Sequence, residues 1–389
     1  MLSESDPIAI LSAARTPIGS FQGGLKTFSA PEIAGVAIGE TLTRAYIRPD
    51  EVDEVLMGCV LPAGIGQAPA RQAAHAAGLS WSTPCSTVNK VCGSGMKTVM
   101  MAGDALRTNN SRLVLAGGME SMTNAPYFLE KHRAGARMGH GRVIDHMFLD
   151  GLEDAYDRGR SMGTFAEQTA EAYKFTRGEQ DAYAIESLDR ATQAISSGSF
   201  LEEIVPVGDL TSDEQPGKAK RERIVQLRPA FKDNGTITAA SSASISDGAA
   251  AVLMARMSTA EALGASPLAI LRGTSAFAQE PSLFTTAPVY AIRNLLDKVG
   301  WATNDVDLFE VNEAFAVVPM VAMRVLGIPH DKMNVNGGAC ALGHPLGCSG
   351  TRVIVTLLSA LRARGLKKGV ASLCIGGGEA TAVAVELLQ

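Results

Sequence analysis

Short apolar runs alternate with amphipathic helical segments along most of the chain, a pattern typical of α/β layers. The pattern occurs twice, in the same order. In the first copy, strands are predicted at residues 8–11, 54–57 and 113–116, and helices at residues 68–77 and 93–107. In the second copy, strands are predicted at residues 268–271, 307–311, 370–375 and 380–387, and helices at residues 289–299, 314–326 and 350–364. The chain is therefore predicted to contain a duplicated α/β unit.

The duplication is also visible in individual residues. Residues 91–97 read Val-Cys-Gly-Ser-Gly-Met-Lys, and residues 346–352 read Leu-Gly-Cys-Ser-Gly-Thr-Arg. Val-Asp pairs precede these two motifs at similar spacing, at residues 52–53 and 306–307. The first copy thus has the thiol of Cys92 where the second copy has Gly347. Two unlike copies of one fold favour a site at the junction between them.

A long insertion distinguishes the two copies. In the second copy three glycines, residues 376–378, lead directly into the last predicted strand. In the first copy the matching strand, predicted at residues 249–254, follows only after residues 119–245. This charge-rich insertion beside a shared site is predicted to cover the substrate.

Three parts are therefore predicted. They are an N-terminal core half of residues 1–118 plus 246–266, a loop domain of residues 119–245, and a C-terminal core half of residues 267–389. Helices are predicted in the loop domain at residues 165–175 and 179–197, the second beginning with the capping box Thr176-x-x-Glu179. Residues 213–223 are predicted to form a mobile, basic surface loop.

Composition limits the possible functions. Hydrophobic residues make up 46% of the 389 residues and the formal net charge is −5, so charge gives no basis for nucleic-acid binding. No apolar run approaches the roughly 18 residues of a membrane span, and residues 1–6 resemble no signal peptide. We expect a cytoplasmic protein without nucleic-acid or membrane partners.

The six cysteines form no C-x-x-C pair, and a reducing compartment would keep them as thiols. Cys340 and His344 could be half of a zinc site, but a second close pair of ligands is missing, so no metal is expected. Cys59, Cys85 and Cys340 are expected to fill small apolar sites.

Cys92 immediately precedes a predicted helix. The unpaired N–H groups at the start of a helix would lower the pKa of this thiol, and the glycines of residues 93–95 would let a substrate approach the backbone. A structural cysteine at a helix N-cap is the alternative. A dinucleotide-binding loop is a weaker interpretation, because Thr98 stands where its third glycine would be.

Three further residues are candidates for chemistry. His344 lies next to the position that corresponds to Cys92, so the two loops should face each other as a Cys–His pair, although it could be a plain loop histidine. Cys374 ends a predicted strand before three glycines, whose N–H groups make good oxyanion donors. Asn312 lies at a strand-to-helix turn, where it could cap the helix, orient a water or polarise a carbonyl.

Four segments together resemble the thiolase family: Asn-Lys-Val-Cys-Gly-Ser-Gly at residues 89–95, Val-Asn-Glu-Ala-Phe-Ala at 311–316, Asn-Gly-Gly-Ala-Cys-Ala-Leu-Gly-His-Pro-Leu-Gly at 336–347, and Cys-Ile-Gly-Gly-Gly at 374–378. The resemblance covers essentially the whole chain. It implies a duplicated five-layer αβαβα core with an inserted loop domain, and an acyltransferase that exchanges acyl groups between thioesters. It also implies a homodimer or homotetramer.

The resemblance implies a role for each candidate. Cys92 would carry the acyl group, His344 would activate it, and Cys374 would be the second acid/base. Asn312 would hold a water that forms one oxyanion hole with His344, while the backbone N–H groups of Cys92 and Gly376 would form the other. Coenzyme A thioesters would be substrates, with no further cofactor.

Coenzyme A would bind largely through the loop domain. Its pantetheine channel would be lined by Leu152, Met162, Leu227, Phe231, Ala239, Ala314 and Phe315. The anionic nucleotide end would meet some of Lys218, Lys220, Arg221 and Arg223, unless these belong to a solvated loop.

The segments at residues 278–288 and 335–350 resemble those of acetoacetyl-CoA thiolases, which favours condensation of two acetyl-CoA molecules. Two positions depart from that branch: Ser161 replaces a usual histidine, and Ala243 replaces a hydroxyl near the thioester. The alternatives are a degradative 3-ketoacyl-CoA thiolase of broader chain length, a decarboxylating ketoacyl synthase, and a non-catalytic acyl-CoA binder. Cys374 argues against the synthase, which needs no proton-abstracting thiol.

Overall fold

A computed structural model describes residues 6–388, and its strands form one continuous path through both copies. The order is β4-β3-β5-β8-β1-β9-β12-β11-β10, with the short β2 (Gly19–Ser20) paired to β8. The first copy supplies β1 (Ile8–Arg15), β3 (Glu54–Gly58), β4 (Cys85–Val88), β5 (Leu113–Ser121) and β8 (Ser246–Arg256). The second copy supplies β9 (Ala269–Ala278), β10 (Leu308–Val311), β11 (Lys368–Ile375) and β12 (Glu379–Leu387).

The two copies have the same strand topology. In the first, β3 and β5 are parallel and β5, β8 and β1 are antiparallel; in the second, β10 and β11 are parallel and β11, β12 and β9 are antiparallel. Even the paired aspartates correspond. Asp53 accepts hydrogen bonds from the backbone N–H groups of residues 112 and 113, and Asp307 accepts them from those of residues 367 and 368. The predicted duplication is confirmed.

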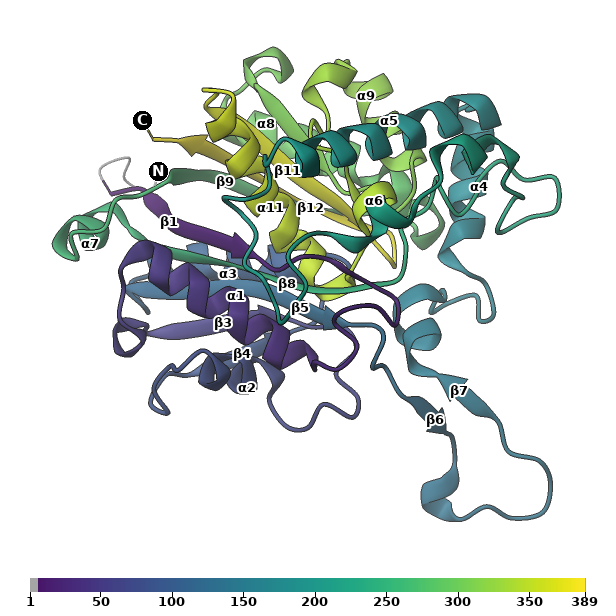
Figure 1. Ribbon diagram of the computed structural model, residues 1–389, viewed down its shortest axis with the longest axis horizontal. Helices are drawn as coiled ribbons and strands as arrows, with labels where there is room; N and C mark the ends of the chain where they lie inside the picture. The colour runs from purple at the N-terminus through teal and green to yellow at the C-terminus, as the bar shows by residue number, and fades with distance from the viewer. Residues whose placement is uncertain (1–5, 389) are drawn as a thin grey trace.

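Helices complete five layers (Figure 1). The middle layer consists of α3 (Ser94–Arg107) and α11 (Leu346–Ala363), which pack on each other between the two parts of the sheet. The outer layers are α1 (Ala30–Ala45) with α2 (Pro69–Ala76) on the first copy, and α8 (Ala287–Val299) with α9 (Val317–Leu326) on the second. Small helix α7 (Met257–Ala262) follows β8. The predicted αβαβα core is confirmed.

The Ser-Gly pair that the two motifs share, at residues 94–95 and 349–350, lies in this middle layer. A side chain on Gly95 would lie 2.7 Å from Thr351 of α11, and one on Gly350 would strike the backbone of Met96 in α3. A side chain on Gly93 would collide with Ile375. The prediction that these glycines give a substrate access to the backbone is therefore wrong. They let two buried helices approach closely.

Several predicted boundaries were wrong for reasons of tertiary packing. β5 does not end before Gly117 and Gly118, because these residues pair with β3 and β8 and leave no space for side chains. α9 begins at Val317 instead of residue 314, because Ala314 and Ala316 exchange backbone hydrogen bonds with the segment 241–243. Helix α1 and strand β4 were not predicted, and most other core strands and helices differ from prediction mainly at their ends.

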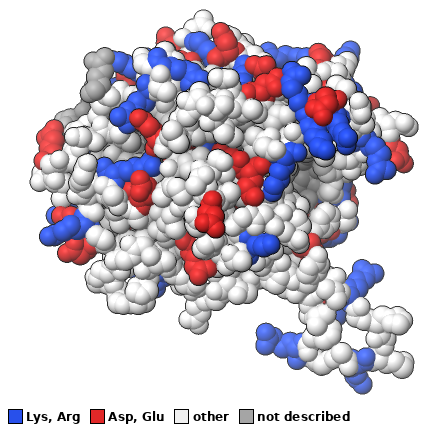
Figure 2. Space-filling view, viewed as in Figure 1, with Lys and Arg blue, Asp and Glu red and all other residues white. Residues whose placement is uncertain are grey.

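The insertion packs over the second copy and projects away from the core (Figure 1). Its main helices are α4 (Met162–Ala172) and α5 (Arg177–Ser196), and the predicted capping box at Thr176 is present. The projecting part is the hairpin of β6 (Tyr127–Leu129) and β7 (Val143–Asp145). Figure 2 shows Lys and Arg side chains around its tip. A π-helical turn, Phe148–Leu152, leads back toward the core.

The predicted mobile loop at residues 213–223 is instead ordered against the core. It contains α6 (Glu214–Lys218) and the start of a 3-10 helix, Arg221–Gln226. Buried Asp213 accepts a hydrogen bond from the guanidinium of Arg15 at 2.7 Å, and Glu203 accepts another at 2.6 Å. This ion-pair network fixes the segment to β1.

Within residues 6–388, no helix is long and apolar enough to span a membrane.

Candidate active site

A cavity of about 260 Å³ opens where the two copies and the insertion meet. The first copy contributes Cys92, and the second contributes His344 and Gly376. The insertion contributes Met162 and Phe231, among other apolar side chains. The predicted site at the junction of the copies is therefore a real cavity, and the predicted encounter of the Cys92 and His344 loops is confirmed.

A strained turn presents Cys92 to this cavity. The preceding residue, Val91, has φ +46°, a left-handed conformation that costs a β-branched residue about 1–3 kcal/mol. Ser94 stabilises the turn, because its hydroxyl accepts from the N–H of Lys90 at 2.8 Å and donates to the carbonyl of Val91 at 2.6 Å. The side chain of Lys90 forms an ion pair with Glu379, which joins this turn to the glycine turn of the other copy.

The thiol of Cys92 is protonated at rest. Burial raises its pKa to about 11, although the backbone N–H groups of Gly376 and Cys92 donate to the sulfur and lower it. The prediction that the helix start lowers this pKa is thus wrong in its net sign, because the loss of water outweighs the N–H groups. The thiol needs a base before it can attack a thioester.

His344 has the tautomer that such a base requires. The Ser349 hydroxyl donates to the carbonyl of Pro345 at 2.9 Å, so it must accept at 2.6 Å from the Nδ1–H of His344. The Nε2 atom is then free of a proton. Burial, together with the positive charge of Arg352, lowers the pKa of His344 to about 3. The ring is therefore neutral and able to accept a proton.

Cys374 lies near the end of β11 and close to Cys92, although it is not one of the residues that line the cavity. The side chain is fully buried, and burial raises its pKa well above the usual range, with Cys92 as a second cause. Cys374 is therefore also a neutral thiol at rest. After it, Gly377 and Gly378 have φ of +89° and +92°, which explains two of the three glycines.

Asn312 follows β10 and is almost completely buried. Its Oδ1 accepts from Nη2 of Arg352 at 3.3 Å, so its Nδ2 faces Nε2 of His344 at 3.5 Å. The interpretation as a helix cap is wrong, because α9 begins only at Val317. Asn312 supplies an N–H donor beside the base.

Sequence reasoning missed two residues of this cluster, Arg352 and Glu310. The guanidinium of Arg352 lies 3.8 Å from the carboxylate of Glu310, and both side chains are at most 2% exposed. One signal was available: a single arginine stands in an otherwise uncharged stretch, residues 350–361. Its partner on β10 could not be identified without the fold.

Glu120 is buried beside Gly347, the residue of the second copy that corresponds to Cys92 of the first. Its carboxylate accepts from the N–H of Gly347 at 2.8 Å and from those of Val60 and Leu61 at 3.0 and 3.1 Å. A side chain on Gly347 would lie 2.5 Å from the carbonyl of Met119. This contact explains why the second copy has glycine where the first has a cysteine.

Gly347→Ala should therefore destabilise the protein by about 1–3 kcal/mol, since the added methyl group meets backbone atoms that cannot move freely. Thermal unfolding should show a lower Tm. Gly39→Ala in α1 is the matched control, because its methyl group would meet nothing within 4 Å and alanine favours a helix. Equal Tm values for the two variants would contradict this explanation.

The predicted coenzyme A residues divide between two cavities. The active-site cavity is lined by Leu152, Met162, Phe231, Ala314 and Phe315. A second cavity of about 250 Å³ contains Leu227 and Ala239 together with Lys220 and Arg223. The single channel formed by all seven residues therefore stays a prediction.

Only part of the predicted basic cluster is available to a ligand. Lys218 pairs with Glu214 at 3.3 Å, and Arg221 pairs with Asp189 at 2.7 Å. Lys220 and Arg223 form no ion pair with any residue in the range 6–388, and both line the second cavity. Cys340 packs against the hydrophobic core of the second copy, while its N–H donates to the carboxylate of Glu313 and its thiol to the backbone carbonyl of the same residue.

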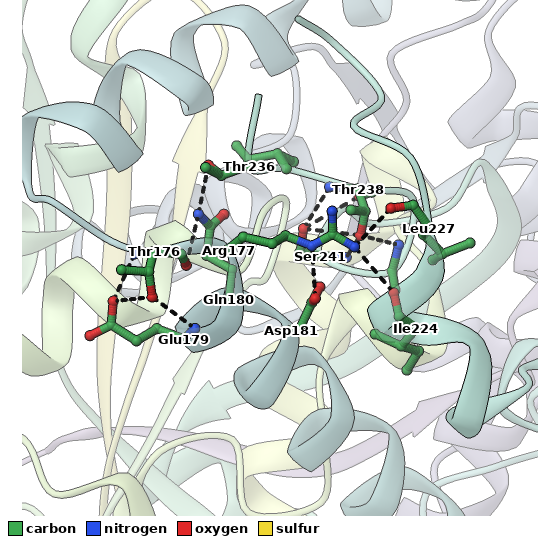
Figure 3. Close-up of polar contacts among 12 residues, drawn as sticks. Thr176, Arg177, Glu179, Gln180, Asp181, Ile224, Leu227, Thr236, Thr238 and Ser241 are labelled. Atoms are coloured by element: carbon green, nitrogen blue, oxygen red, sulfur yellow. Dashed lines mark hydrogen bonds and ion pairs between the residues drawn. The ribbon is translucent and has the colours of Figure 1, made fainter. Parts of the chain in front are cut away.

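One arginine fixes the wall of the second cavity (Figure 3). Arg177, in the first turn of α5, donates to the carbonyls of Ile224 and Leu227 at 3.3 and 2.8 Å. Its Nε donates to Asp181 at 2.7 Å. Together with the ion pair between Arg221 and Asp189, these bonds hold the 3-10 segment that carries Arg223 to α5.

The fold and the site together define an acyltransferase. Family models match over most of the chain: "Thiolase, N-terminal domain" at residues 8–258 and "Thiolase, C-terminal domain" at residues 265–387. The chain belongs to the thiolase family.

Similar proteins agree over their whole length. The chain is 47% identical to "Acetyl-CoA acetyltransferase" of Chromobacterium violaceum, covering 97% of this chain and 99% of that one. It is 45% identical to "Acetyl-CoA acetyltransferase 1" of Arabidopsis thaliana, with 98% and 94% covered. The crystal structure of Acat5 thiolase from Ascaris suum in complex with coenzyme A has a TM-score of 0.94 at 40% identity, covering 98% of this chain and 100% of that one.

Proposed function

We propose that the protein catalyses the reversible Claisen condensation of two acetyl-CoA molecules to acetoacetyl-CoA and coenzyme A, through an acyl group on Cys92. The observation that carries this proposal is that the neutral thiol of Cys92 and the neutral imidazole of His344 line a single apolar cavity, while the buried thiol of Cys374 lies near Cys92. Relatives that are about 45% identical carry the name acetyl-CoA acetyltransferase, which supports the same substrate.

In the first half-reaction His344 Nε2 takes the proton of Cys92, and the thiolate attacks the thioester carbonyl. The backbone N–H groups of Cys92 and Gly376 point at this sulfur, so they are placed to donate to the carbonyl oxygen as it becomes negative. The carbon–sulfur bond to coenzyme A then breaks. Cys374 gives its proton to the departing thiolate, which leaves an acyl-Cys92 and a Cys374 thiolate.

In the second half-reaction the Cys374 thiolate takes the α-proton of the second acetyl-CoA. Asn312, through a water, and the protonated His344 stabilise the enolate oxygen, because preorganised donors are worth about 3–4 kcal/mol each. The enolate carbon attacks the acyl group and releases the Cys92 thiolate. His344 returns its proton to Cys92, so every residue regains its starting state.

The direct test is acetoacetyl-CoA mixed with coenzyme A, from which two acetyl-CoA should form per turnover. A release of free coenzyme A on mixing with acetyl-CoA alone would exclude a non-catalytic binder. Malonyl-CoA should release no carbon dioxide. If carbon dioxide is released and acetoacetyl-CoA is not cleaved, the protein is a decarboxylating synthase and the proposal fails.

Acetoacetyl-CoA should be the best substrate, with measurable but poorer cleavage of 3-ketopentanoyl-CoA and 3-ketohexanoyl-CoA. Ser161 and Ala243 both line the cavity and are small, so some longer tails should enter, each buried methylene contributing about 0.8 kcal/mol. Values of kcat/KM over chains of four to ten carbons measure this. A steady rise with length would instead identify a degradative thiolase of fatty acid metabolism.

We further propose that the protein acts in the cytoplasm as a homodimer or homotetramer, with no cofactor beyond its coenzyme A thioester substrates. Six free cysteines support a reducing compartment, and the resemblance to thiolases supports the assembly. Light scattering at several protein concentrations measures the assembly, and cell fractionation tests the location. Activity after exhaustive dialysis against a chelator tests the absence of a cofactor.

A further inference from the structure

One helix controls two of the groups that the proposed chemistry requires. Ser349 and Arg352 lie three residues apart on α11, so they share a face of the helix. Ser349 accepts from Nδ1 of His344, and Arg352 donates to Oδ1 of Asn312. The base and the amide come from separate loops, yet both are oriented by the same buried helix.

The contact between Arg352 and Asn312 decides which way the amide points. An asparagine side chain can rotate by half a turn with little change in shape, which exchanges its donor and acceptor ends. The guanidinium has only donors, so Oδ1 must face it. The NH2 group is then directed at the bare Nε2 of His344. Without Arg352 the amide could turn its oxygen toward the base.

Arg352 also places a positive charge beside the imidazole. It is 1% exposed, and its Nε and Nη1 have no hydrogen-bond partner within residues 6–388. Its one ion-pair partner in that range is Glu310, whose pKa burial raises to about 8. Arg364, Glu313 and Glu203 also face Glu310. The carboxylate therefore only partly offsets the charge of Arg352 near neutral pH.

We propose that Arg352 is a positioning residue, which orients the amide of Asn312 and places a positive charge beside the imidazole of His344. The reaction assigned to this site is the proposed function above. Arg352 itself does not line the cavity, so its loss should lower kcat and leave KM for acetyl-CoA nearly unchanged. The loss of a residue with only a structural role would not lower kcat while leaving KM unchanged.

The reactivity of Cys92 supplies a second test that needs no substrate. Without the positive charge, His344 holds a proton more readily, so the ion pair of thiolate and imidazolium becomes more populated. In Arg352→Met, alkylation of Cys92 by iodoacetamide at pH 7 should become faster by about tenfold or more, the effect of one pKa unit. Turnover should nevertheless fall by on the order of 10²-fold. A loosened fold would also expose the buried thiol of Cys59 to alkylation, so the expected result is acceleration at Cys92 with no acceleration at Cys59.

Two further variants separate the effect of the positive charge from the orientation of the Asn312 amide. Arg352→Lys keeps the positive charge but loses the planar guanidinium that orients the Asn312 amide. Alkylation of Cys92 should therefore match the wild type while kcat falls. Glu310→Gln removes the opposing charge, so alkylation should slow, most clearly above pH 8 where Glu310 is ionised. The proposal is overturned if folded Arg352→Met alkylates no faster than the wild type. It is equally overturned if Arg352→Lys retains full turnover, which decides the matter should the methionine variant not fold.

These measurements also test the role of Arg352 separately from the proposed function. A wild-type protein that cleaves no acetoacetyl-CoA would contradict the proposed reaction. The alkylation rates of the wild type, Arg352→Met and Glu310→Gln would still show whether Arg352 controls the Cys92–His344 pair.

Discussion

Cys92→Ser should abolish acyl-enzyme formation and lower turnover by on the order of 10⁴-fold or more, the scale of removing a nucleophile from a set that acts together. A hydroxyl is far less acidic than a thiol, and His344 is a weak base because burial lowers its pKa to about 3. It can remove the proton of a thiol only as the sulfur attacks. Mass spectrometry after treatment with acetyl-CoA should show one acetyl group on Cys92 in the parent protein and none in the variant.

The matched control is Cys85→Ser. Cys85 is a free, half-buried thiol on strand β4 that does not line the cavity, so the variant should still acetylate at Cys92. Two results would show that Cys92 is not the nucleophile. One is a stable acetyl group on another cysteine of the parent protein, and the other is a mass of Cys92→Ser that shows the same acetylation as the parent.

The features that could be predicted from the sequence are those that occur in both copies of the α/β unit. Asp53 and Asp307 precede matching motifs, and both make the same backbone contacts, because a duplicated unit needs the same local hydrogen bonds. Cys92 and His344 were expected to meet for the same reason: loops at equivalent positions of two copies lie on opposite sides of one axis. The sequence therefore contains the fold and the reacting groups in a form that can be recognised.

The unpredicted part depends on partners that are distant in the sequence. The sequence places Asp213 in a charged loop, whereas the structure shows it buried in an ion pair with Arg15. Arg352 meets Glu310 of β10, and Glu120 meets the N–H of Gly347. Each is a buried charge, and a buried charge persists only when a specific partner compensates it. Periodicity reveals which side chains are buried, but it does not reveal these partners.

The net pKa of Cys92 was also unpredictable, because two opposing effects act on it. The N–H groups were visible in the motif, whereas the depth of burial arises from the insertion and the second copy. Both cysteines and the histidine rest in neutral forms, so no charge has to be stabilised in the apolar cavity before substrate binds. The proton of Cys92 is released only when the thioester is present to receive the sulfur.

Cys374→Ala separates the two half-reactions. The variant should still acetylate at Cys92, because the thiolate of coenzyme A is a good leaving group without an acid. Condensation, and cleavage of 3-ketoacyl-CoA, should fall by at least about 10²-fold, the contribution of a positioned acid or base. The Tm should change little, since a small buried side chain is replaced by another of similar volume.

The decisive measurement is exchange of the acetyl α-hydrogens of acetyl-CoA with solvent deuterium. Removing an α-proton requires a base next to the methyl group, and His344 is already protonated once Cys92 carries the acyl group. Among the residues described, Cys374 is a thiol that lies near Cys92, and its thiolate is strongly basic, since burial and Cys92 both raise its pKa. Exchange should therefore disappear in Cys374→Ala while acetylation of Cys92 persists. Exchange at the wild-type rate in this variant would mean that another group is the base.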